Sequence, residues 1–327
     1  MVRTVLFHPR RPAAADRVDQ AVPLRPAAIG RAAEVQRLCR QSGLATLPAM
    51  STASSPAIAF IGGGNMASAL IGGLIRAGRP ADGILVIDPF EAQRQRLVAD
   101  FGVQVLAAAD ASLDDAALVV WAVKPQLFAQ AAAPSAAHVR GALHLSVMAG
   151  IRSETIARAV GVDPAWAHIV RSMPNTPALI GRGIAGLFAT PAVSAGERGL
   201  VEQVLAPTGQ TLWVAQEADL DAVTALSGSG PAYIFYFIEA MMAAAAQMGL
   251  TREQGKQLAL ATFDGATALA AQSSEPPEVL RERVTSKGGT TYAALQSLQA
   301  SGVQPAIVQA VLAAQQRARE LGDEFGG

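Results

Sequence analysis

Three consecutive glycines indicate phosphate chemistry near the start of the patterned part of the chain. Residues 62–67 read Gly-Gly-Gly-Asn-Met-Ala, follow a short apolar run and open a helical pattern, so they fit G-x-G-x-x-A. In that motif Gly62 permits a tight turn, and Gly64 lets a diphosphate approach the backbone at the start of a helix. The alternative is a glycine-rich turn without a ligand; a P-loop is disfavoured because no Gly-Lys-Ser/Thr follows. The phosphate candidates are Gly62, Gly64, Asn65 and Met66.

An acidic residue ends the next apolar run. "ILVID" closes at Asp88, and an acid in this position usually accepts a ribose 2′-hydroxyl and repels the extra phosphate of NADP. Arg94 and Arg96 follow and could bind such a phosphate. All three could equally be solvated residues at a helix start, so the choice between NADPH and NADH stays open.

Further loops follow other apolar runs, where open α/β sheets bind their ligands. They are "AVKPQ" from residue 122, "SVMAG" from 146 and "RSMPNTPALIGRG" from 171. Lys124 either lines a cofactor crevice or is an exposed strand-end lysine. The cofactor candidates in these loops are Ala122, Val123, Lys124, Pro125, Ala149, Gly150, Asn175 and Pro177.

Hydroxyl groups and glycines also mark two helix starts late in the chain. In "ALSGSGPAY", Ser227 and Ser229 are expected to cap a helix that begins at Pro231. In "RVTSKGGTTYAAL", residues 283–295, hydroxyls and bare N–H groups at a helix start could bind a carboxylate or phosphate. An ordinary capped turn explains the second stretch equally well.

An alternating β and α pattern from residue 57 onward positions these loops. The expected strands are 57–61, 84–87, 103–106, 118–123, 143–147 and 168–171, and the expected helices are 65–77, 90–101, 126–138 and 153–160. Short, fully apolar strands such as "ALVVWAV" are typical of a parallel sheet covered on both faces. The pattern predicts a doubly wound α/β domain of the Rossmann type.

The pattern of apolar residues changes near residue 216. From there on no strand is convincing, and helices are expected at 231–248, 252–271, 277–284, 292–299 and 304–321. The helix from Pro231 is apolar almost all round, so it needs either the centre of a bundle or a second subunit. We predict a dinucleotide-binding domain at 50–215 and an all-α domain at 216–327.

Composition narrows the function further. The 327 residues carry 26 basic and 26 acidic side chains, which gives no reason to expect a nucleic acid or an anionic membrane as partner. The only cysteine, Cys39, rules out an intrachain disulfide and a cysteine-rich zinc site, so we expect no metal and a reducing, cytoplasmic setting. Residues 1–49 are rich in arginine and could form a targeting arm. We favour the other interpretation, that this segment is disordered or is translated from upstream of a true start at Met50.

Taken together, the motifs resemble pyrroline-5-carboxylate reductase. The resemblance runs from about residue 57 almost to the end, through "FIGGGNMASAL", "AVKPQ", "MPNTPALIGRG", "LSGSGPAYIFYFIEAM" and "VTSKGGTTYAAL", the last two being specific to the family. It implies reduction of a cyclic imine to proline with NADPH, often NADH too, and a helical domain that interlocks with a partner in a homodimer or higher oligomer. This chain departs from the family pattern at Lys287, where proline is frequent, and at Asp88 and Pro89.

The resemblance also suggests roles in the site. We expect the Ser286 hydroxyl and the N–H groups of Gly289 and Thr290 to hold the substrate carboxylate. Thr291 is expected to hydrogen-bond the ring nitrogen, a role taken from the family alone. The nicotinamide would lie against the candidates Ala149, Asn175 and Pro177.

Two other functions remain as alternatives. One is a hydroxyacid-dehydrogenase type of reductase, but its acid lysine is missing from the helix 231–248. The other is a non-enzymatic dinucleotide sensor, which the intact "SKGGTT" loop disfavours. A protonated imine is already cationic, so its reduction requires no general acid, in keeping with the absence of histidine from these loops.

Overall fold

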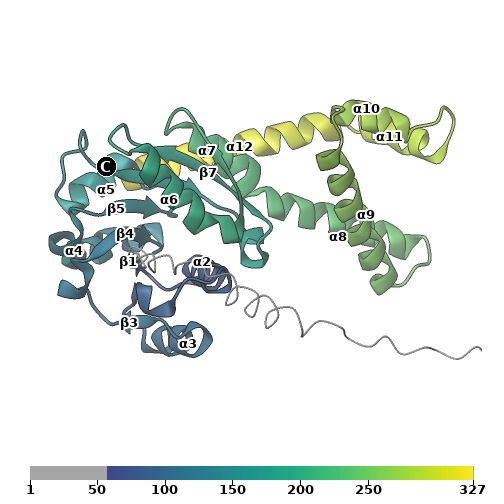
Figure 1. The fold of residues 1–327 in the computed structure, drawn as a ribbon. Helices are drawn as coiled ribbons and strands as arrows, with labels where there is room; N and C mark the ends of the chain where they lie inside the picture. Colours follow the sequence, from purple (N-terminus) through teal and green to yellow (C-terminus); the bar gives the residue numbers. More distant parts are fainter. Residues whose placement is uncertain (1–56, 327) are drawn as a thin grey trace, which may run out of the picture. The chain divides into compact units, whose positions relative to one another are not determined.

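The structure is a computed structural model that describes residues 57–326 (Figure 1). The expectations for residues 1–49 therefore lie outside the described part of the chain. One sheet of eight strands has the order β3-β2-β1-β4-β5-β6-β7-β8. The strands are β1 (Ala57–Ile61), β2 (Ile84–Ile87), β3 (Gln104–Leu106), β4 (Ala116–Trp121), β5 (Leu143–Ser146), β6 (Ile169–Met173), β7 (Gly183–Ala189) and β8 (Gly209–Trp213).

The sheet confirms the predicted Rossmann-type topology. Strands β1 to β6 pair in parallel on either side of β1, which has β2 and β4 as its neighbours. The strand order therefore reverses next to β1, and this switch point is where such sheets bind ligands. The pairing of β6 with β7 is antiparallel, and β8 pairs in parallel with β7, so β7 and β8 both run opposite to the first six strands.

Helices cover both faces of the sheet because the strand residues alternate between two cores. On one face, Ile58 and Phe60 pack with residues of α2 and α6; on the other, Ala59 and Trp121 pack with residues of α4 and α5. We call the eight strands and the helices that follow them up to residue 223 the sheet unit. Its helices are α2 (Asn65–Arg76), α3 (Glu91–Phe101), α4 (Phe128–Val139), α5 (Ser153–Val160), α6 (Ala195–Leu205) and α7 (Asp219–Val223).

Two strands, β7 and β8, and two helices, α6 and α7, were not anticipated. Two glycines in β7 hide it, since glycine weakens an isolated strand. A Cβ on Gly186 would lie 2.7 Å from the Val223 side chain, and one on Gly183 would lie 2.8 Å from the Ala178 backbone. Both glycines are thus explained by close tertiary packing, which is not visible in the local pattern.

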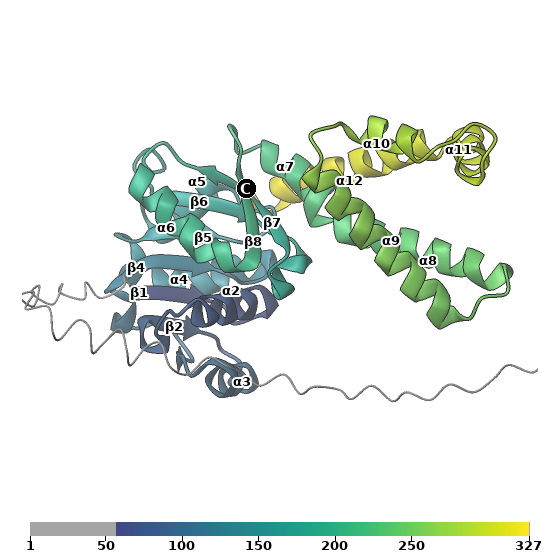
Figure 2. The ribbon, with the colours of Figure 1, turned by 45° about the vertical axis from the view of Figure 1, so that its right-hand side comes forward.

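The remaining helices follow α7, with no further strand in the described part of the chain. They are α8 (Gly230–Gln247), α9 (Arg252–Gln272), α10 (Pro277–Arg283), α11 (Thr290–Ala300) and α12 (Val303–Gly326). In both views α8 and α9 lie side by side, and α10 and α11 lie away from the strands (Figures 1 and 2). No helix in the described range is long and apolar enough to cross a membrane.

A π-helical turn, Thr224–Gly228, joins α7 to α8 and overturns the expected serine cap. The Ser229 N–H donates to the carbonyl of Thr224, and the Ser227 hydroxyl donates to the carbonyl of Val223. Neither side chain caps α8. The predicted cap was wrong because the backbone is already helical before α8 begins, so the turn supplies the partners.

The long helix α8 exposes large apolar side chains. Tyr236 is 73% exposed and Phe235 is 59% exposed in the single chain. The chain itself therefore does not provide the cover that the all-round apolar pattern demands, which favours the second of the two expectations, a partner subunit.

Candidate active site

Each glycine of the turn after β1 has a different physical role. Gly62 has φ +97°, and a Cβ there would lie 2.7 Å from the carbonyl oxygen of Ala122. A Cβ on Gly63 would lie 2.6 Å from Leu97 of α3. Gly64 has φ −65°, allowed for any residue, and within residues 57–326 no atom outside its own chain neighbours lies within 4 Å of its Cβ position. The fold therefore explains the first two glycines, and the third leaves open space at the start of α2.

The start of α2 offers unpaired backbone donors to that space. The first hydrogen bond of the helix runs from the Ser68 N–H to the Gly64 carbonyl, 2.9 Å. The N–H groups of Asn65, Met66 and Ala67 precede it, and no side chain caps them. No acidic residue lies in the first turn. These donors and the helix dipole fit the diphosphate of a dinucleotide.

The other cofactor candidates gather at the same edge of the sheet. Because β1, β4, β5 and β6 are parallel, the residues after them meet at one edge: Ala122, Val123, Lys124 and Pro125 after β4, Ala149 and Gly150 after β5, and Asn175 and Pro177 after β6. Lys124 is exposed there. The Asn175 amide has a structural task, since it donates to the Ser227 carbonyl and accepts from the Ile184 N–H.

Asp88 lies at this edge too, at the end of β2, but its carboxylate contacts the protein. It accepts the Gly63 N–H at 2.8 Å and the Phe90 N–H at 2.9 Å. Arg94 donates to the Asp88 carbonyl at 2.8 Å. Sequence reasoning missed these contacts because the partners lie up to 25 positions apart.

A charged cluster supports the turn at Gly150. Glu217 accepts both the N–H and the hydroxyl of Ser153 at the start of α5, and it pairs with buried Arg171 at 2.9 Å. Burial raises the pKa of the neighbouring Asp221 carboxyl, and Arg171 opposes that shift. From the end of α12, Phe325 lies 3.2 Å from the Cβ position of Gly150. The last helix thus returns to the sheet edge.

The hydroxyl-rich loop between α10 and α11 is not at this edge. It lies with α10 and α11, away from the strands (Figures 1 and 2). Gly288 has φ +77°, and the Gly289 N–H donates to the Ser286 carbonyl at 3.0 Å, so this donor is already used within the turn. Thr290 and Thr291 open α11, whose first helical bond runs from Ala293 to Gly289. Their N–H groups remain as donors at a helix start.

Comparison with known proteins identifies the group to which the chain belongs. The model of the pyrroline-5-carboxylate reductase dimerisation domain matches residues 217–321, and the model described as NADP oxidoreductase coenzyme F420-dependent matches residues 57–150. The pyrroline-5-carboxylate reductase of Pseudomonas aeruginosa is 43% identical over 276 residues, covering 84% of this chain and 99% of the relative. The chain belongs to the pyrroline-5-carboxylate reductase family.

Other pyrroline-5-carboxylate reductases agree. The Haemophilus influenzae enzyme is 41% identical, covering 81% of this chain and 97% of its own length. The Coxiella burnetii structure superposes with a TM-score of 0.76 at 35% identity, covering 82% of this chain and 98% of that one. The Plasmodium falciparum structure, which has NADP bound, superposes with a TM-score of 0.73 at 27% identity, covering 82% of this chain and 99% of that one. Family members are NAD(P)H-dependent oxidoreductases acting on a C=N bond, and the chain carries their dimerisation domain.

Proposed function

We propose that the chain reduces the C=N bond of 1-pyrroline-5-carboxylate to give L-proline, the closing step of proline biosynthesis. The family membership carries this proposal, and the uncapped start of α2 beside Gly64 supports a dinucleotide as hydride donor. The cofactor is NADPH, with NADH as a second donor. We place the enzyme in the cytoplasm, with no nucleic acid or membrane as partner.

The residues of the chain divide the work between two regions. Gly64, Asn65 and Met66 hold the cofactor diphosphate, and Ala149 and Pro177 flank the nicotinamide, which supplies the hydride when bound. Ser286 and the Thr290 N–H hold the substrate carboxylate, and Thr291 hydrogen-bonds the ring nitrogen. A protonated imine loses its positive charge on reduction, so the residues need to position the ring rather than supply an acid.

The two regions work together through the dimer. The loop that carries Thr291 lies away from the sheet edge of its own chain, and α8 leaves apolar side chains uncovered (Figure 1). We propose that the loop of the partner subunit meets the cofactor edge, and that this homodimer can build a larger oligomer.

One assay tests the reaction. NADPH consumption is followed with 1-pyrroline-5-carboxylate and with a panel of 2-keto and 2-hydroxy acids. Turnover of the imine alone supports the proposal, whereas turnover of the acids favours a hydroxyacid dehydrogenase. No turnover of either, with nucleotide still bound, favours a sensor.

Thr291→Ala tests the assigned role. We expect kcat to fall about 100-fold because the ring loses its positioning partner, with NADPH affinity unchanged. Thr291→Ser keeps a hydroxyl and should recover most of the rate. Unchanged turnover in Thr291→Ala would remove this side chain from the mechanism.

A further inference from the structure

The side chain of Asp88 is buried against the glycine turn. It is 6% exposed, and its two carboxylate oxygens accept the N–H groups of Gly63 and Phe90. Such bonds from a carboxylate to backbone donors are among the stronger hydrogen bonds in proteins. The acid that ends β2 is therefore tied to the phosphate turn as well as to the residue that opens α3.

The other side of Gly63 is held from the same direction. The Gln93 amide donates to the Gly63 carbonyl at 2.5 Å, and the Ser68 hydroxyl donates to the same oxygen at 3.3 Å. The Cβ position of Gly63 is only 3.2 Å from the Asp88 carboxylate. Asp88, at the end of β2, thus binds the N–H of Gly63, and Gln93, in the first turn of α3, binds its carbonyl.

These two hydrogen bonds to Gly63 lie directly before the proposed diphosphate site. Gly63 precedes Gly64, which has open space at its Cβ position, and Gly64 precedes the uncapped N–H groups of α2. Fixing both peptide groups of Gly63 fixes the direction in which the following N–H groups point. The observed contacts differ from the role expected for an acid here, which is to accept a ribose hydroxyl.

We infer that Asp88 and Gln93 are positioning residues for the phosphate-binding turn, and that Asp88 does not act chiefly by discriminating between NADH and NADPH. This inference rests on the proposed function only in that a dinucleotide binds at the turn. The two cofactors share the diphosphate and differ at the 2′ oxygen. A residue that sets the diphosphate site changes both affinities by the same factor, whereas one that reads the 2′ oxygen changes their ratio.

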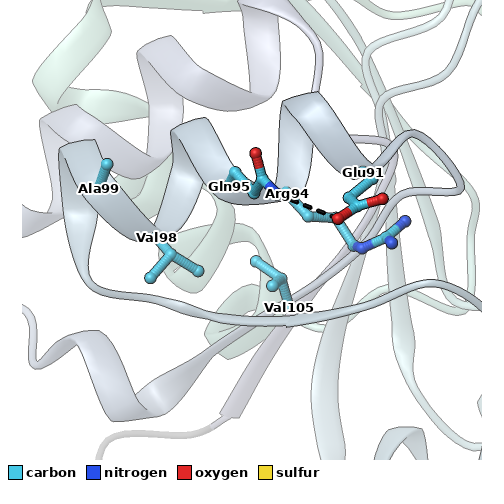
Figure 3. Close-up of a pocket in the computed structure, with 6 residues that line it drawn as sticks. All are labelled: Glu91, Arg94, Gln95, Val98, Ala99 and Val105. Atoms are coloured by element: carbon cyan, nitrogen blue, oxygen red, sulfur yellow. Dashed lines mark hydrogen bonds between the residues drawn. The ribbon is translucent and has the colours of Figure 1, made fainter.

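The experiment compares three variants of the full-length protein: Asp88→Asn, Gln93→Ala and the control Gln95→Ala. Gln95 lies on α3 two residues from Gln93, and its amide donates to the Glu91 carboxylate on the outer side of the helix, beside the hollow of about 440 Å³ that Arg94 also lines (Figure 3). Dissociation constants for NADPH and NADH are measured by titration calorimetry, and amide hydrogen exchange is followed at residues 63–67.

We expect Asp88→Asn and Gln93→Ala to raise both dissociation constants about 10-fold, leaving their ratio unchanged, because each variant loses one bond that orders the turn. Exchange at 63–67 should accelerate while the central strands stay protected. Gln95→Ala should alter neither.

Two results would overturn the inference. One is an Asp88→Asn variant that binds NADPH more tightly and NADH more weakly, since the acid then reads the 2′ oxygen. The other is a Gln93→Ala variant with unchanged affinity and exchange, which decides the matter if Asp88→Asn does not fold. Failure of the proposed reaction is separate, since it is a loss of imine turnover in the unaltered protein.

Discussion

At the scale of single residues, His144 and Trp121 form a buried polar pair in the sheet. The Trp121 indole N–H donates to Nδ1 of His144 at 3.1 Å, and the other ring nitrogen of His144 is buried without a hydrogen-bond partner in the described chain. Burial, with a smaller contribution from His168, lowers the pKa of His144 to about 4. The folded protein therefore keeps this ring neutral across the physiological range.

The depressed pKa predicts a loss of stability in mild acid. Below about pH 6.5 the unfolded chain protonates this ring, but the folded chain does so only below about 4. The free energy of unfolding should thus fall as pH drops through this window, by about 3 kcal/mol in total. Urea unfolding between pH 7.5 and 4 measures the slope.

His144→Gln removes the titrating group while its carbonyl can still accept the Trp121 N–H. We expect the variant to be less dependent on pH between 6.5 and 4. An unchanged slope would mean that other groups cause the acid sensitivity.

At the scale of elements, the turn between β1 and α2 contains one glycine that the fold requires, Gly62, and another that the proposed cofactor binding requires, Gly64. Gly62→Ala should destabilise the protein by about 2 kcal/mol or more, because φ is +97° and the new methyl would meet the Ala122 carbonyl. Gly64→Ala should leave stability nearly unchanged but weaken NADPH binding at least about 10-fold, since the methyl would fill the open space.

Thermal unfolding and NADPH titration of the two variants check this pair. Unchanged affinity in Gly64→Ala would show that the cofactor does not use that space. Unchanged stability in Gly62→Ala would contradict the strained geometry.

The same elements show what the sequence could predict. The apolar period predicted β1 and β2 with their bounds and α2 to within one residue at its end, and the motif placed the phosphate turn between β1 and α2. The apolar pattern could not predict β7, because its glycines are required by close contacts with Val223 and Ala178 in other elements. The serine cap failed because the π turn before α8 already pairs the backbone. Contacts such as that between Asp88 and Gly63 depend on how the chain returns, which local spacing does not encode.

At the scale of the whole molecule, the exposed face of α8 predicts dependence on a partner. Phe235→Glu places a charge on a side chain that is 59% exposed in the single chain. If the partner covers this face, burying the carboxylate is costly, and we expect a monomer in gel filtration with imine turnover lost and NADPH binding retained.

Trp166→Glu is the matched control. Trp166 is 74% exposed but follows α5 in the sheet unit, so we expect dimer and turnover to persist. A Phe235→Glu variant that remains dimeric and active would place the subunit contact elsewhere.

The π turn at Thr224–Gly228 has a mechanical consequence for α8. A π turn accommodates one residue more than an α turn, and each residue of an α-helix advances the rotation by about 100°. Shortening the turn by one residue into a regular helix would therefore rotate every side chain of α8 by roughly a quarter of a revolution while leaving the strands intact. The phase of the apolar face, and hence its alignment toward a second chain, is set by this one inserted position.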